Sequence, residues 1–115
     1  MYTQVASKLA VKDANVPFYS QAVSMAGANA IQAEVSMFSI SATSGTPALT
    51  VSAEASNDLQ NWDPLGAFDA TLTLIGYATK KFTDIAHGYV RLKFVMTAGS
   101  DPRAIVAAGV NTANL

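Results

Sequence analysis

The sequence has no cysteine, a single histidine and few charges. The lack of cysteine excludes disulfide bonds, thiolate nucleophiles and cysteine-ligated metal sites. Charged residues make up 13% of the chain, against roughly 25% in an average soluble domain. A folded chain of this size exposes on the order of 6,000 Å², so Ala, Ser, Thr and backbone must cover much of it. We expect this surface to pack against other subunits, because small side chains lose little entropy when ordered. The alternative is a monomer with a surface rich in Ser and Thr.

Long apolar runs and basic clusters are also missing. Runs such as Ala104–Val110 are too short to cross a bilayer, and the first residues lack the basic and apolar regions of a secretory signal. The net charge is −1, and Lys80-Lys81 is the only adjacent basic pair. Arg91 and Lys93 share one face of a predicted strand. We therefore expect neither nucleic acid nor a membrane as the partner.

Strand patterns dominate what is present. Apolar and polar residues alternate through Leu49–Ala55 and through Tyr89–Thr97, and this period of two predicts strands with one buried face. A helix over Ala26–Ala33 is opposed by Gly27 and Asn29. Further strands or extended segments are predicted at Gln4–Val11, Val16–Tyr19, Thr71–Ile75, Ala78–Phe82 and Arg103–Val110, and Val23–Ala28 is either a short strand or a turn.

The alternation changes phase inside one predicted strand, Glu34–Ile40. Met37 belongs to one apolar series and Phe38 to the other, which predicts a β-bulge at this pair. The turn-forming segment Ser41–Pro47 follows. Residues 30–56 are therefore predicted to form a β-hairpin with a longer loop.

The pattern as a whole predicts an all-β protein. The 115 residues fit one domain, residues 1–115. Seven or eight short strands separated by Gly, Pro and Asn indicate a single antiparallel β-sandwich of jelly-roll type. Residues 1–20 form a candidate extended N-terminal arm, which could lie across a neighbouring subunit and add a strand to its sheet edge.

No residue pattern indicates catalysis or a cofactor. His87 falls in a predicted turn with no serine placed beside it, and we interpret it as a polar loop residue. The aspartates Asp58, Asp63, Asp69 and Asp84 lie in turn-rich segments, where this residue type commonly bonds the backbone. A calcium site is a weaker alternative, and its ligands would be Asn57, Asp58, Asn61 and Asp63. Phosphate loops and nucleophile elbows are absent from the sequence, so we expect no catalytic residue, no metal and no cofactor.

Aromatic residues are the candidate interaction residues. Trp62 is the only tryptophan. We favour a core position for it, packed with Leu59, Leu65 and Phe68, over an exposed position where it could stack on sugars. The complete set of candidate interaction residues is Trp62, Tyr77, Tyr89, Tyr2, Phe18 and Tyr19.

Two segments carry a resemblance to a known fold. Ala55–Trp62 reads ASNDLQNW and resembles the S-N-D-x-x-x-W turn of discoidin-like jelly rolls, and Ile85–Leu92 reads IAHGYVRL and resembles their A-x-Y-V-R-L strand. Similar segments occur in small β-sandwich proteins of tailed-phage particles, of head-decoration or head-fibre type. The resemblance covers about 40 residues and implies a fold. No binding residue is carried over, because the ligand loops of discoidin domains have no counterpart in this shorter, cysteine-free chain.

Two functional hypotheses follow, with a third that is weaker. The first is a structural virion protein, made in a host cytoplasm, which assembles into a symmetric homo-oligomer and contacts other particle proteins. The second is a carbohydrate-binding module with Trp62, Tyr77 and Tyr89 as platforms. The third is a small hydrolase or metal-dependent enzyme.

Overall fold

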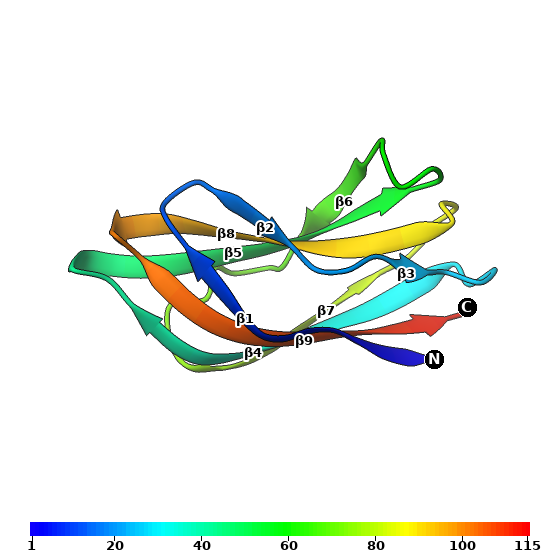
Figure 1. Ribbon diagram of the computed structural model, residues 1–115. Helices are drawn as coiled ribbons and strands as arrows, with labels where there is room; N and C mark the ends of the chain where they lie inside the picture. The colour runs from blue at the N-terminus through cyan, green and yellow to red at the C-terminus, as the bar shows by residue number, and fades with distance from the viewer.

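The computed structural model describes residues 1–115 as two antiparallel sheets packed face to face (Figure 1). Sheet A has the strand order β1-β9-β4-β7, and sheet B has the order β2-β8-β5-β6 with β3 also paired to β8. The predicted all-β sandwich is confirmed, with nine strands instead of seven or eight. The strands are β1 (Tyr2–Lys12), β2 (Pro17–Tyr19), β3 (Val23–Ser24), β4 (Ala30–Ser41), β5 (Ser44–Ser56), β6 (Asp63–Ala67), β7 (Gly76–Phe82), β8 (Tyr89–Ser100) and β9 (Arg103–Ala113).

The connectivity is that of a jelly roll. The short strands β2 and β3 pair with successive parts of β8 and act as one interrupted strand. Counted in this way, sheet A follows the order 1-8-3-6 and sheet B the order 2-7-4-5, which is the arrangement of two interlocked Greek keys. Both chain ends lie at the same end of the sandwich (Figure 1).

The core lies between the two sheets and is built by the predicted alternation. In β8, Val90, Leu92, Phe94 and Met96 are fully buried, while the residues between them face outward. Strand β5 contributes Leu49 and Val51, which are the inward-facing residues of its own apolar–polar alternation. The cluster comprises 23 buried residues. Full burial of one large apolar side chain contributes about 1.5–3 kcal/mol, so this cluster supplies the main stabilisation of a chain without disulfides.

The predicted hairpin over residues 30–56 is wrong. Strand β4 pairs with β7 and β9 in sheet A, whereas β5 pairs with β6 and β8 in sheet B. The chain crosses between the layers at Ala42 and Thr43. Each strand has one apolar face, and crossing over places the two faces against the same core. Gly45, with φ of +78°, adopts a backbone conformation in this region that other residues rarely take.

Of two other local predictions, one is confirmed and one is wrong. The bulge at Met37-Phe38 is confirmed, because the β4–β9 register shifts between Met37 and Ser39. As a result Met37 is buried and Phe38 is 52% exposed. The strand predicted at Thr71–Ile75 is wrong, since only Leu72 of this segment forms an isolated bridge, to Leu49.

The N-terminal segment lies in the sandwich. Residues of β1 pair with β9 in sheet A, and those of β2 pair with β8 in sheet B. The candidate arm over residues 1–20 therefore pairs with strands of its own chain in this structure, since its apolar side chains such as Val5 and Val11 complete the core. No helix capable of crossing a membrane occurs in the structure.

Candidate interaction surfaces

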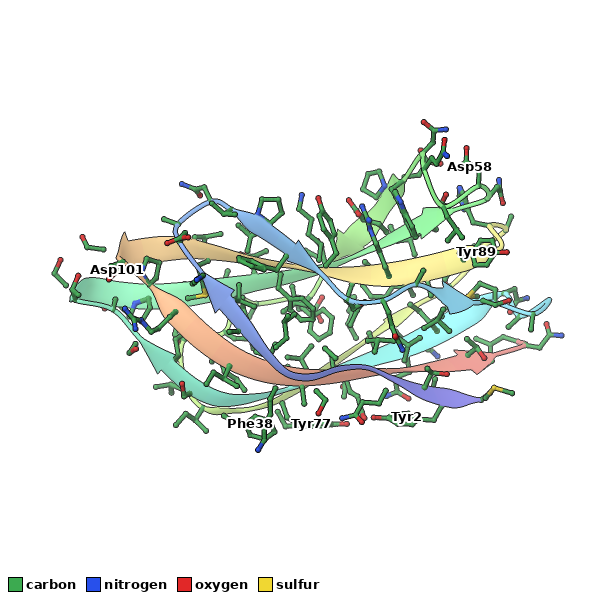
Figure 2. The ribbon with its side chains drawn as sticks, in the orientation of Figure 1. Tyr2, Phe38, Asp58, Tyr77, Tyr89 and Asp101 are labelled. Atoms are coloured by element: carbon green, nitrogen blue, oxygen red, sulfur yellow. The ribbon has the colours of Figure 1, made fainter.

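The outer face of sheet A carries four large exposed side chains. Tyr2 is 55% exposed, Phe38 52%, Tyr77 64% and Ile105 39%. They come from four different strands, β1, β4, β7 and β9. The labelled side chains Tyr2, Phe38 and Tyr77 project from this sheet away from the core (Figure 2). The bulge in β4 contributes directly, because it turns Phe38 outward.

A carboxylate and two phenols lie at the middle of this face. The hydroxyl of Tyr77 donates to Oε2 of Glu34 at 2.7 Å. This hydrogen bond, and after it the hydroxyl of the neighbouring Tyr2, lower the pKa of Glu34. The carboxylate in turn raises the pKa of both tyrosines. The acid in the middle of the face, Glu34, therefore has a hydrogen-bond donor within its own chain.

A glycine makes room for this arrangement. Gly109 pairs with Gln4 on one side and with Glu34 on the other. A methyl group added at Gly109 would overlap the hydroxyl end of the Tyr2 ring, so this part of the ring lies over the glycine. A shallow hollow of about 180 Å³ remains beside it. It is lined by Tyr2, Gln4, Glu34, Ser36, Ala107 and Ala108.

The outer face of sheet B has a different construction. The guanidinium of Arg91 lies 3.8 Å from the ring centroid of Tyr19 and 4.0 Å from that of Trp62. It also forms an ion pair of 2.9 Å with Glu54 on the adjacent strand. The side chains of Arg91 and Glu54 are only 20% and 15% exposed. Stacked aromatic rings and a paired carboxylate thus satisfy the cation, which fixes β2 and the loop before β6 onto the sheet.

The predicted core position of Trp62 is wrong. Trp62 is half-buried on the outer surface, and of its three expected neighbours only Phe68 is buried. Leu59 is 48% exposed. The reason is a cation outside the core: the guanidinium of Arg91, on β8, stacks on the face of the indole ring.

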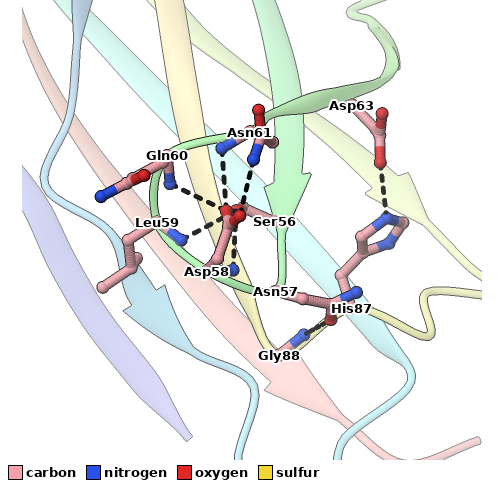
Figure 3. A network of polar contacts seen from close by, with 9 residues as sticks. All are labelled: Ser56, Asn57, Asp58, Leu59, Gln60, Asn61, Asp63, His87 and Gly88. Carbon is pink, nitrogen blue, oxygen red and sulfur yellow. Dashed lines mark hydrogen bonds and ion pairs between the residues drawn. The ribbon is translucent and has the colours of Figure 1, made fainter.

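The loop between β5 and β6 is held by one aspartate (Figure 3). Oδ1 of Asp58 accepts hydrogen bonds from the backbone amides of Gln60 and Asn61 at 2.9 and 2.8 Å. Its Oδ2 accepts from the side-chain amide of Asn61 at 2.6 Å. These bonds, with the backbone amide of Asn61 as the largest cause, hold the pKa of Asp58 far below its ordinary value. The ASNDLQNW segment therefore closes its own turn.

The other polar groups at this end pair separately. Nε2 of His87 lies 3.0 Å from Asp63, and Asn57 accepts from the amide of Gly88 at 3.1 Å. Ser56 bonds to Asp58 and to the backbone, and has no bond to His87 (Figure 3). No three His, Cys, Asp or Glu side chains are grouped so as to hold a metal ion. Of the four oxygen donors considered for calcium, Asp58 and Asn61 bond to each other, whereas Asp63 pairs with His87 and Asn57 with the amide of Gly88.

The structure separates the aromatic residues named from the sequence. Tyr77 and Tyr2 lie on the outer face of sheet A, whereas Tyr19 and Trp62 flank Arg91 on sheet B. Tyr89 is half-buried at the start of β8, and Figure 2 shows it on the opposite side of the sandwich from Tyr77. Phe18 is partly buried against the core. Trp62, Tyr77 and Tyr89 therefore do not form one platform.

Sequence reasoning missed three residues of these surfaces. Glu34 was not singled out, because its two tyrosine partners are distant in sequence, with Tyr77 43 positions away. Phe38 was noted only for the bulge, although the phase change itself predicts that one of the two neighbouring apolar residues turns outward. Glu54 could have been found only by knowing that β5 and β8 are adjacent.

Comparisons with known proteins give no family. No protein-family model matches the chain, and no curated protein sequence matches it. Solved structures do show the same fold. The SPBc2 prophage-derived protein YomS is similar with a TM-score of 0.52 at 9% identity, over 96% of this chain and 92% of that protein.

Two CBM domains are similar to the same degree. The CBM22-1 xylan-binding domain of Paenibacillus barcinonensis Xyn10C gives a TM-score of 0.54 at 9% identity, over 99% of this chain and 86% of that one. The CBM36-1 domain of a multidomain xylanase from the hindgut metagenome of Trinervitermes trinervoides gives 0.53 at 10% identity, over 100% and 98%. At these identities the likeness shows the β-sandwich fold alone.

Proposed function

We propose that this chain is a non-enzymatic structural protein that assembles into a symmetric homo-oligomer, as a component of a virus particle. The observation that carries the proposal is the row of exposed large side chains on the outer face of sheet A, which includes Phe38, Tyr77 and Ile105. Large exposed apolar patches mark interaction surfaces. The likeness in fold to a prophage-derived protein supports the particle setting.

The mass of the purified protein in solution tests this function. We expect light scattering across a concentration series to give a closed oligomer of fixed stoichiometry. A mass of 12.0 kDa at every concentration would contradict the proposal.

A second candidate function is carbohydrate binding. The observation that favours it is the group of Tyr2, Glu34 and Tyr77, which combines exposed rings with a carboxylate that can accept sugar hydroxyls. The likeness in fold to a xylan-binding domain supports this candidate.

Calorimetric titration with xylo-oligosaccharides tests the second candidate. Binding by the wild type that is lost in Tyr77→Ala and kept in Tyr89→Ala would favour it. The matched control is apt because Tyr89 is also a tyrosine but lies on the other sheet. Absence of binding by the wild type would argue against it.

A further inference from the structure

The exposed apolar side chains of the strands are unevenly divided between the two sheets. Five such large side chains lie within strands, and four of them, Tyr2, Phe38, Tyr77 and Ile105, belong to sheet A. Sheet B has only Tyr19, whose ring is stacked on Arg91. The two faces of this sandwich therefore differ in how readily they lose water.

We propose that the outer face of sheet A is the self-association interface, and that it packs against the same face of a second copy across a two-fold axis. This inference rests on the proposed function and specifies the surface that performs it. In such an isologous contact each residue set meets itself or its symmetry mate. The face must therefore be complementary to itself in polarity, charge and area.

Polarity meets this condition because the central acid is already hydrogen-bonded. A carboxylate covered by an apolar partner would be costly if it lost its water without replacement. Glu34 keeps the hydroxyl donor of Tyr77 when water leaves, and Tyr77 keeps Glu34 as its acceptor. The hydroxyl of Tyr2 lies close enough to the same carboxylate to lower its pKa. The middle of the face can thus be buried without leaving a charge unpartnered.

Charge at one end of the face is balanced. Lys12, Arg103, Asp13 and Asp101 surround one hollow with the apolar Ile105. Within it Arg103 pairs with Asp101 at 3.2 Å. Two cations and two acids at the same end do not repel an identical end, and they can exchange partners across an interface. A strongly charged partner would gain no comparable advantage there.

Area is sufficient for a second copy. Strands β1, β9 and β4 have 11, 11 and 12 residues and β7 has 7; with a spacing of about 4.8 Å and a rise of about 3.3 Å per residue they give a face of roughly 600 Å². The contact would then remove roughly 1,200 Å² from both copies, the lower limit for a specific interface. Two sheets packed in this way lie about 10 Å apart, as in the sandwich itself.

A charge placed in the face tests the proposal. We expect Phe38→Asp to weaken self-association by about 100-fold, because it brings an unpaired charge into the contact twice. The matched control is Leu59→Asp, since Leu59 is 48% exposed on the loop before β6 and receives the same charge. Light scattering at several concentrations measures both variants. Equal weakening by both variants, or by neither, would overturn the assigned surface.

Thiol protection gives a second readout that does not depend on a disruptive substitution. Ser36 and Ser52 are both half-buried and lie on the outer faces of sheets A and B, respectively. Because the chain has no cysteine, a cysteine introduced at either position is the only thiol of the variant. With nine-tenths of the protein assembled, the thiol of Ser36→Cys should react about tenfold more slowly than in the dilute protein. The thiol of Ser52→Cys should react at the same rate in both. Full reactivity of Ser36→Cys in the assembled protein would refute the interface and point to contacts between sheet edges.

The failures of the two proposals are distinguishable. A wild type that stays monomeric refutes the proposed function and the interface together. A wild type that assembles while Phe38→Asp assembles equally well, or while the thiol of Ser36→Cys remains reactive, refutes the interface and leaves the function standing.

Discussion

Glu54 and Arg91 form an ion pair across the adjacent strands β5 and β8, with 2.9 Å between Oε1 and both Nε and Nη2. Both side chains are largely shielded from water. An ion pair in such a position is strong only as long as both partners remain, because a shielded charge without a partner retains its desolvation cost.

The first prediction concerns this pair. Arg91→Leu should lower the free energy of unfolding by about 2 kcal/mol, because it leaves Glu54 unpartnered and removes the stack on Tyr19 and Trp62. Urea unfolding followed by Trp62 fluorescence measures the change. The double variant Arg91→Leu with Glu54→Leu is the control. It should be more stable than the sum of the single changes predicts, since no lone charge remains. Strict additivity would show that the two side chains do not act together.

The second prediction concerns the glycine under Tyr2. Gly109→Ala should displace the Tyr2 ring, because the added methyl group overlaps it. The amide of Thr112, which bonds the carbonyl of Met1 at 2.8 Å, should then exchange faster with solvent. The loss of stability should stay near 1 kcal/mol, since the ring can swing away. In a Tyr2→Ala background the same glycine substitution should have almost no effect. An equal effect in both backgrounds would contradict the contact.

The third prediction compares the two residues of the bulge. Met37→Ala should destabilise the fold by about 2–5 kcal/mol, because Met37 is only 1% exposed and its removal leaves a cavity. Phe38→Ser should change stability by less than about 0.5 kcal/mol, because Phe38 is on the surface. Thermal unfolding at low protein concentration, where assembly makes no contribution, measures both. A large loss for Phe38→Ser would mean that its ring supports the fold of the single chain.

The fourth prediction concerns pH. The pKa of Asp58 is lowered by hydrogen bonds, first from the backbone amide of Asn61. A lowered folded-state pKa contributes stability that is fully present above the ordinary value of 3.8 and is lost as the pH falls below it. Unfolding experiments at pH 7 and pH 2.5 should therefore show a smaller difference between wild type and Asp58→Ala at the lower pH. A difference that does not change with pH would contradict the role of the ionised carboxylate. Asp84→Ala provides the control, as another exposed aspartate in a loop.

Local patterns predicted the elements well where one face of a strand is buried. The alternation in β8 identified both its core residues and its outward residues, since a period of two directly reports the two faces of a strand. The phase change at Met37-Phe38 predicted the bulge for the same reason. The segment Thr71–Ile75 also reads as a strand, but it forms only one bridge. Strand propensity needs a partner strand to take effect.

Pairing partners were not predictable in the same way. The residues between β4 and β5 permit either a hairpin within one sheet or a crossing between two sheets, and both bury the same apolar side chains. The choice depends on β9 and β8, which take the neighbouring positions and come from the other end of the chain. Trp62 was misplaced for a similar reason, because its partner Arg91 is brought beside it only by the sheet.

The sequence by itself determined an all-β chain without disulfides, with a core supplied by alternating apolar residues and with too few charges to cover its surface. These properties follow from composition and from periodicities of a few residues. Only the tertiary structure decided which strands share a sheet, that Tyr2 and Tyr77 converge on Glu34, and that one outer face holds most of the exposed apolar side chains of the strands. Contacts between residues tens of positions apart depend on how the whole chain fills one core, and no local pattern records that packing.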